Sequence, residues 1–108
     1  VKSELPYSIE SNVEEKNFRK GNAYITFSRY DTDDVSLIKL AKKKGYELGK
    51  EIGLISYNDT AVKEILEGGI TVISTDFEMM GKAAASVILN KNVIYKRNPT
   101  KVIIRNSL

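Results

Sequence analysis

The chain contains no cysteine and no histidine among its 108 residues. The absence of cysteine excludes disulfides and thiol nucleophiles, and the absence of both residues removes the usual zinc ligands. Histidine is also the side chain that most often transfers protons near neutral pH. These absences argue against many enzyme classes at once. We therefore expect a protein that is not an enzyme and that uses neither a metal ion nor a cofactor.

Several sequence signals of membrane insertion and nucleotide binding are also missing. No stretch approaches the ~18 apolar residues of a membrane span, and the amino terminus lacks the basic-then-apolar pattern of a signal peptide. Neither a Walker pattern nor GxGxxG is present, since Gly68-Gly69 follows a predicted helix instead of leading into one. We found no internal repeat, low-complexity tract or internal linker. The sequence therefore predicts a single domain without membrane contact.

The composition is that of an ordinary globular protein, with 42% hydrophobic and 29% charged residues and a net charge of +3. The main cluster of basic residues, Lys42 to Lys44, lies near the end of a predicted helix. It either complements the helix dipole or forms a nucleic-acid patch, and the dipole explanation is the simpler one. The chain begins with Val1 instead of Met. We therefore expect residues 1–108 to be a fragment or a processed form, either one domain or one lobe of something larger.

Apolar runs with the period of strands alternate with helical segments along the chain. The predicted strands are Tyr7–Ile9, Ala23–Phe27, Glu51–Tyr57, Ile70–Ser74 and Lys101–Arg105. The run that ends at Tyr57 is nearly continuous in apolar residues, which is typical of a parallel strand covered on both faces. Alternation of this kind predicts an α/β fold. We expect a three-layer αβα lobe with a mostly parallel sheet of about five strands.

A weak helical segment, Val13–Lys20, and three clearer predicted helices connect these strands. The first of the three runs from Asp31 to Gly45, opening with carboxylates and closing with lysines. The second, Thr60–Leu66, places Val62, Ile65 and Leu66 on one side, which either packs on the sheet or forms a subunit contact. The third begins with a capping box, Thr75 with Glu78, and reaches about Asn90. Its apolar residues recur at helical spacing and form the clearest amphipathic stripe in the chain: Met80, Ala83, Ala84, Val87 and Ile88.

Two of the apolar strands run directly into polar clusters, Ser56 to Thr60 and Ser74 to Phe77. Ligands of open parallel sheets bind just outside the carboxyl ends of the strands, so these clusters are the first candidates for a site. Two interpretations of Asn58 and Asp59 are open. Either these residues only cap the following helix, or one of them caps the helix while the other faces a ligand. Phe77 is either a core residue or an apolar platform beneath a ligand.

The carboxylates Asp31, Asp33 and Asp34 follow the strand Ala23–Phe27. Carboxylates clustered at a strand end can bind Mg²⁺ or include a phosphoacceptor. The alternative is that they only begin the next helix, where acidic residues are favoured. We regard helix capping as the better explanation, because Asp and Thr stand where a helix start requires them.

The order and spacing of these segments resemble a known family. The run IGLISYNDT, eight residues, GITVISTDF, two residues and MG, followed by an alanine-rich helix, resembles the carboxy-terminal lobe of the effector-binding domain of lactose-repressor-type transcription regulators. That family is related to periplasmic sugar-binding proteins. The closing KVIIRNSL is similar to the family's last strand, so the resemblance covers Ala23 to Leu108. The sequence STDFEMMGKAAA looks closest to the corresponding stretch of regulators that carry a GntR-type winged-helix head.

The resemblance implies roles for particular residues. Asn58 matches the family position that contacts effector hydroxyls, and Phe77 matches the residue that packs against the apolar face of the effector. Asp31 matches an acid after the first strand, with Tyr30 where the family has Asn or Ser; this tyrosine either stacks on a sugar ring or fills the site. Arg29 is a candidate anchor for an anionic or hydroxyl group.

The function that the resemblance implies is that of a ligand-sensing lobe of a bacterial transcription regulator. Its effector would be a sugar or a similar small polar molecule. The full-length protein would be cytoplasmic, would form a homodimer, and would contact DNA only through an amino-terminal head outside these residues. One alternative is a lobe of a periplasmic sugar-binding transport protein. A second is a flavodoxin-like enzyme half-domain that uses the aspartates with Mg²⁺.

Overall fold

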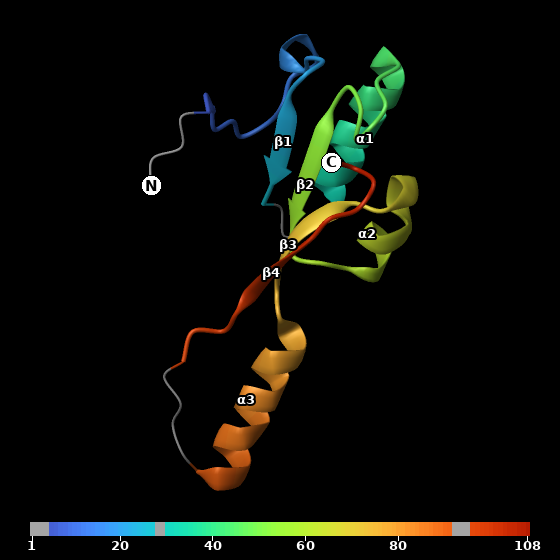
Figure 1. The fold of residues 1–108 in the computed structure, drawn as a ribbon. Helices are drawn as coiled ribbons and strands as arrows, with labels where there is room; N and C mark the ends of the chain where they lie inside the picture. Colours follow the sequence, from blue (N-terminus) through green and yellow to red (C-terminus); the bar gives the residue numbers. More distant parts are fainter. Residues whose placement is uncertain (1–4, 28–29, 92–95) are drawn as a thin grey trace.

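The computed structural model describes residues 5–27, 30–91 and 96–108 (Figure 1). Its elements follow the order η1 (Glu15–Asn17), β1 (Ala23–Thr26), α1 (Thr32–Lys44), β2 (Gly53–Tyr57), α2 (Ala61–Ile65), η2 (Leu66–Gly68), β3 (Thr71–Thr75), α3 (Phe77–Asn90) and β4 (Thr100–Ile103). The alternation of strands and helices confirms the predicted α/β class. In the described part of the chain, no helix is long and apolar enough to cross a membrane.

The strands form one sheet in the order β1-β2-β3-β4. The first three are parallel, and β4 runs antiparallel to β3, with Thr75 opposite Thr100. The predicted mostly parallel sheet is therefore confirmed, with four strands. The segment Tyr7–Ile9, predicted as a further strand, forms none. It stays exposed, because its few apolar residues find no partner to pack against.

One face of the sheet carries the core. Leu54 of β2 and Val72 of β3 point to this face, and α1 adds Leu37, Ile38 and Ala41, all buried. Helices α1 and α2 lie on the same side of the strands (Figure 1). When neighbouring parallel strands follow each other in sequence order, right-handed crossovers put the connecting helices on the same side of the sheet. The core extends to Phe18, which is fully buried and stacks on the rings of Tyr24 and Tyr46.

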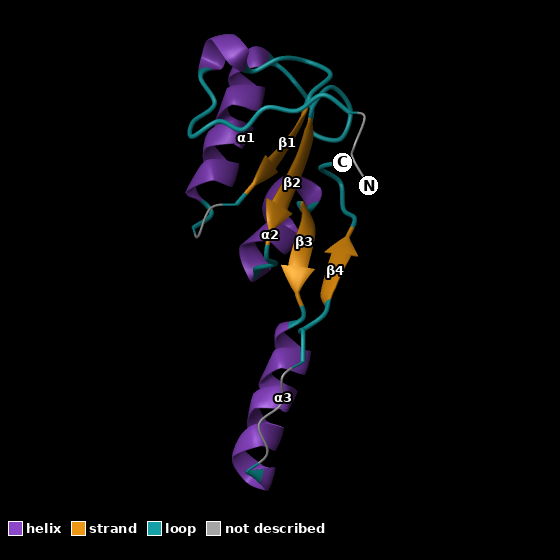
Figure 2. Ribbon diagram, turned by 90° about the vertical axis from the view of Figure 1, so that its left-hand side faces the viewer, coloured by secondary structure: helices purple, strands orange, loops and turns teal. Residues whose placement is uncertain are grey.

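The helices α2 and α3 leave apolar side chains exposed. In α2, Val62 and Ile65 are exposed, and the residue turned inward is Lys63. A buried lysine requires oxygen partners, and α2 lies where the adjacent strand ends supply them. In α3, no residue is buried, and the helix extends away from the sheet (Figures 1 and 2). The second helical layer predicted for the sheet is thus not formed by α3.

The start of α3 also corrects the predicted cap. The capping residue is Asp76, whose carboxylate accepts a hydrogen bond from the amide of Met79 at 3.0 Å. Thr75 instead ends strand β3, and Glu78 pairs with Lys82 one turn later at 2.6 Å. The aspartate one residue later can cap in the same way, because either side chain accepts from an amide of the first turn.

The carboxy-terminal tail is tied into the sheet by Ser107. Its buried hydroxyl donates to the carbonyl oxygen of Leu54 at 2.6 Å and accepts from the amide of Thr71 at 2.8 Å. The Ser107 carbonyl oxygen also accepts from the Leu54 amide. These bonds join β2 and β3 at their amino ends, which leaves the opposite, carboxyl edge of the sheet free for other contacts.

Candidate functional site

The carboxyl ends of β1, β2 and β3 meet at one edge of the sheet, as the parallel arrows show (Figure 2). The polar clusters predicted from the sequence follow these ends. The structure brings Asn58, Asp59 and Asp31 to this edge, together with the start of α3 at Phe77. Tyr30 directly precedes Asp31 at the same edge, and the last predicted residue, Arg29, lies outside the described residues. We call these connections, residues 30–31, 58–60 and 75–77, the carboxyl edge.

Asn58 is fixed in the turn that follows β2. Its backbone is left-handed, with φ of 61°, and its amide donates to the carbonyl oxygen of Ile73 at 2.8 Å. Its side-chain Oδ1 accepts from the amide of Thr75 at 3.1 Å. Asparagine tolerates this backbone region better than most residues do. Because Oδ1 is anchored, the Nδ2 group has a defined position, and among the described residues it has no hydrogen-bond acceptor.

Asn58 is therefore not a helix cap, which was one of the two sequence interpretations. The cap of α2 is Thr60, whose hydroxyl accepts from the amide of Lys63 at 3.3 Å. Asp59 does not cap the helix either, since its carboxylate accepts from Arg105 at 2.7 and 2.8 Å. The side chain left to face a ligand in this turn is Asn58.

The two aromatic candidates stand at the carboxyl edge with large exposed surfaces. Phe77 is the first residue of α3 and is 53% exposed, so the interpretation as a core residue is wrong. Tyr30, between β1 and α1, is 69% exposed. Aromatic side chains together with a few fixed polar groups are the usual lining of small-molecule sites.

Asp34 forms the centre of a buried polar cluster that the sequence analysis missed. Its carboxylate is 1% exposed and accepts hydrogen bonds from the hydroxyls of Thr26 at 2.6 Å and Ser56 at 2.7 Å. The Lys63 Nζ atom lies 3.6 Å from Asp34 and 3.4 Å from Asp31. A signal was present in the sequence: a polar residue occupies an inward position at the end of each strand, where an apolar one is expected.

The three aspartates after β1 therefore serve different purposes. Asp34 is buried in the polar cluster, Asp31 precedes α1 without a side-chain cap bond, and Asp33 lies exposed in the first turn of α1. For Asp31 and Asp34 the capping explanation is thus replaced by an ion-pair network with Lys63, whereas Asp33 is an acidic residue of the first turn, as that explanation predicted. Among residues 5–27, 30–91 and 96–108, no group of acidic side chains has the arrangement to hold a metal ion.

Arg105, just beyond β4, joins the carboxyl edge at Asp59 to Ile70, the residue that precedes β3. Its guanidinium makes the two bonds to Asp59 and a third to the carbonyl oxygen of Ile70 at 3.0 Å. The hydrogen bonds from Arg105 hold the pKa of Asp59 below its ordinary value, and Asp59 raises the pKa of Arg105. Both groups therefore stay charged near neutral pH, and the pair fixes the turn that presents Asn58.

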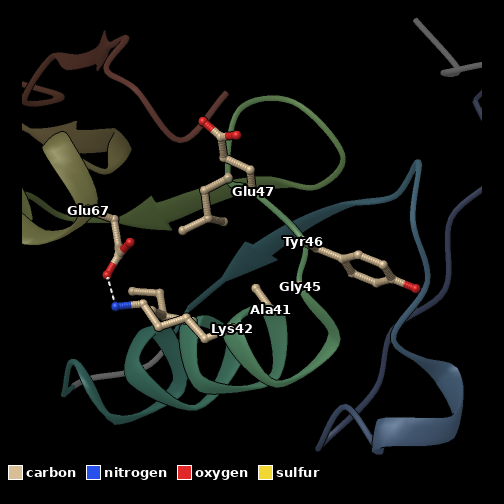
Figure 3. A pocket seen from close by; sticks show the side chains of 8 residues that line it. Ala41, Lys42, Gly45, Tyr46, Glu47 and Glu67 are labelled. Carbon is tan, nitrogen blue, oxygen red and sulfur yellow. Dashed lines mark ion pairs between the residues drawn. The ribbon is translucent and has the colours of Figure 1, made fainter.

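Two hollows in the surface differ in their relation to the carboxyl edge. A cavity of about 200 Å³ lies between the end of α1 and η2, lined by Ala41, Tyr46 and Glu47 among others and crossed by the Lys42–Glu67 ion pair (Figure 3). It is at the amino ends of the strands, and it is smaller than the ~300 Å³ at which ligand pockets usually begin.

The second hollow borders the carboxyl edge. It has a volume of about 560 Å³ and is lined by residues 97–100. Asn98 in its wall donates through Nδ2 to the carbonyl oxygen of Asp76 at 2.9 Å, which joins this wall to the start of α3.

Several solved structures share this fold. The chain matches the lac repressor dimer bound to operator and an anti-inducer, at 18% identity and a TM-score of 0.62, over 79% of this chain and 27% of that one. It matches the transcriptional regulator CelR in complex with cellobiose at 20% identity and a TM-score of 0.58, over 79% and 27%. A candidate transcription regulator from Staphylococcus saprophyticus subsp. saprophyticus matches at 26% identity and a TM-score of 0.60, over 80% and 32%.

These matches show that the chain has the fold found in one part of LacI-type regulators. It spans about a third of the length of the solved structures that it matches. No protein-family model and no curated protein sequence matches the chain. The resemblance inferred from the sequence motifs is therefore confirmed at the level of the fold, which is that of a periplasmic-binding-protein-like lobe.

Proposed function

We propose that this chain is a ligand-sensing lobe of a bacterial transcription regulator and that it binds a sugar or a similar small polar effector at the carboxyl edge. The observation that carries the proposal is the geometry of Asn58. Its Oδ1 is held by the Thr75 amide, so its Nδ2 group is presented in a fixed direction at the same edge of the sheet to which Phe77, two residues after Thr75, contributes an exposed ring. Solved structures of the same fold include a regulator in complex with cellobiose.

The roles of the two residues follow from their chemistry. The Asn58 amide donates hydrogen bonds, which a hydroxyl oxygen accepts. The Phe77 ring offers an apolar surface to the C–H face of a sugar ring, and Tyr30 supplies a second ring on the opposite side of the edge. Asp31 accepts hydrogen bonds from hydroxyl groups. Arg29 remains the candidate anchor for an anionic substituent.

The lobe would hold only half of the site. Effectors of two-lobed proteins bind in the cleft between the lobes, and closure of that cleft moves the rest of the molecule. We infer that a second lobe and an amino-terminal DNA-binding head, of the GntR type, belong to the full-length protein, which would act as a cytoplasmic homodimer. No catalytic role is assigned to any residue.

The test is an NMR titration of the ¹⁵N-labelled chain with glucose, galactose, ribose and cellobiose. We expect the amide signals of Asn58, Thr75 and Phe77 to shift with at least one sugar. The dissociation constant should be on the order of millimolar or weaker, because half of the contacts are missing. The longer protein should bind the same sugar more tightly.

Two results would oppose the proposal. In one, none of the four sugars shifts a signal at the carboxyl edge. In the other, the isolated chain binds as tightly as the longer protein, which would mean that the site is complete without a second lobe. Asn58→Gly is the matched variant, since glycine accepts the same left-handed backbone and lacks only the carboxamide.

A further inference from the structure

Lys63 is a buried cation that contacts two connections of the carboxyl edge. Its side chain is 4% exposed, although it belongs to the short surface helix α2. Its Nζ atom donates to the carbonyl oxygens of Asn58 at 2.8 Å and Tyr57 at 3.1 Å. On its other side it faces the carboxylates of Asp31 and Asp34. One ammonium group thus joins the turn after β2 to the start of α1.

Packing alone does not explain why a lysine occupies this buried position. Removing an ammonium group from water is costly unless charged and hydrogen-bonding partners replace the water. Helix α2 has apolar residues available, but Val62 and Ile65 face outward while the lysine faces inward. An apolar side chain turned inward would fill the same space without this cost.

The partners of Lys63 are themselves rigidly held. The Asp34 carboxylate is fixed by the hydroxyls of Thr26 at the end of β1 and Ser56 in β2. The oxygen atoms of these two hydroxyls lie 3.1 Å apart, so the two strand ends are held close together at the carboxylate. The ends of β1 and β2 therefore fix Asp34, and Asp34 fixes the Lys63 ammonium. The ammonium in turn fixes the carbonyl oxygen of Asn58.

The carbonyl oxygen of Asn58 is the contact that matters most for the site. Asn58 has a left-handed backbone, with φ of 61°, which costs free energy for any residue with a side chain. The hydrogen bond from Lys63 to its carbonyl oxygen favours this conformation. The bond from the Thr75 amide to Oδ1 depends on the same conformation. Without Lys63, both the turn and the direction of the carboxamide are less constrained.

We propose that Lys63 is the positioning residue of the carboxyl edge: it holds Asn58 in the conformation that presents its side chain, and it fixes Asp31 relative to that turn. The inference deepens the proposed function and rests on it for the statement that Asn58 meets a sugar. Lys63 acts through its neighbours and does not contact the effector, because its ammonium group is already surrounded by protein oxygens.

The first test needs no ligand and measures amide hydrogen exchange in the 108-residue chain. In Lys63→Met, we expect the protection of the Asn58 and Thr75 amides to fall by about tenfold or more, since their local opening becomes easier. The Leu54 amide, which donates to the Ser107 carbonyl oxygen at the amino ends of the strands, should keep its protection. Lys82→Met, which removes an exposed lysine from α3, is the matched control and should change none of the three.

The double variant Lys63→Met/Asp34→Asn covers the case in which the single variant does not fold. It removes the lysine without leaving a buried carboxylate unpaired, and it should show the same selective loss at Asn58 and Thr75. A loss of protection that is equal at all three amides, or no loss at all, would overturn the proposal and reduce Lys63 to a structural residue.

The second test repeats the sugar titration with Lys63→Met and the four sugars named above. We expect weaker shifts at Phe77 and Thr75 than in the wild type. Equal binding by the two proteins would count against a positioning role. If the wild type itself binds no sugar, the proposed function fails, while the exchange experiment still decides the role of Lys63.

Discussion

Replacement of Arg105 by methionine is predicted to destabilise the chain through the turn that carries Asn58. The variant keeps most of the apolar stem but removes two hydrogen bonds to Asp59 and one to the carbonyl oxygen of Ile70. A hydrogen bond to a charged group contributes ~1.5–3 kcal/mol. Exposed ion pairs contribute under ~1 kcal/mol, whereas breaking a fully buried pair costs ~3–5 kcal/mol.

The solvent exposure of Arg105 and Asp59 decides where the cost of breaking their ion pair falls between the values for exposed and buried pairs. The side chains of Arg105 and Asp59 are 16% and 19% exposed, so water partly replaces the lost partner. We therefore expect a loss of about 2–3 kcal/mol in the free energy of unfolding. For a chain of this size, that corresponds to a fall of roughly 10 °C in Tm. Thermal and urea unfolding followed by far-UV circular dichroism would measure both quantities.

The effect should also depend on pH with a defined sign. The pKa of Asp59 is lowered from its ordinary value of 3.8, mainly by the hydrogen bonds from Arg105. A carboxylate with a lowered pKa stabilises the folded state above its ordinary pKa, and this contribution is lost as the pH falls through the folded-state pKa. The difference between wild type and Arg105→Met should be constant from about pH 7 to pH 5 and shrink below about pH 4.

The control is Lys82→Met, which removes an exposed i,i+4 pair with Glu78 and should cost only ~0.3–0.5 kcal/mol. The reasoning would be refuted if Arg105→Met cost no more than this control. It would also be refuted if the difference from the wild type were the same at about pH 3 as at about pH 7, since the ion pair would then not be its source.

Four further substitutions test binding and stability separately, two at the candidate site and two at glycines. Asn58→Gly should weaken sugar binding by about tenfold, the loss of one hydrogen bond, and lower the free energy of unfolding by less than ~1 kcal/mol. Phe77→Ala should also weaken binding, and because the ring is 53% exposed, it should cost less than ~1 kcal/mol in a melting experiment. Gly49→Ala should cost about 3 kcal/mol, since its φ is +80° and the added methyl would overlap the Asn106 carbonyl; Gly21→Ala, with φ of +87° and open space around it, should cost about 1 kcal/mol.

The regular pattern of the strands is what made the fold predictable. The runs ending at Tyr57 and Thr75 are apolar enough to be strands in any context, and the carboxylates and lysines around the helix α1 mark both of its ends. Strand β4 was found, but its antiparallel direction was not, because strand direction depends on the path of the preceding connection. The position of α3 away from the sheet could not be predicted either. Its apolar stripe shows which face of the helix is apolar, but not what that face packs against.

The candidate site was predictable in its location but not in its internal contacts. The rule that ligands bind at the carboxyl ends of strands pointed to Asn58 and Phe77, and the structure places both there. Lys63 was not found, because a lysine in an amphipathic helix is normally assigned to the outer face. Its inward position depends on Asp34, which lies 29 positions earlier in the sequence and contacts it only after folding.

The most direct test of the central claim is an intermolecular NOE measurement on the chain with the sugar that produces the largest shifts. We predict NOEs from the ring protons of the sugar to the aromatic protons of Phe77 and to the Nδ2 protons of Asn58. NOEs to Tyr46 or Leu48 instead would place the sugar in the cavity beside α1, at the opposite end of the strands, and would contradict the account.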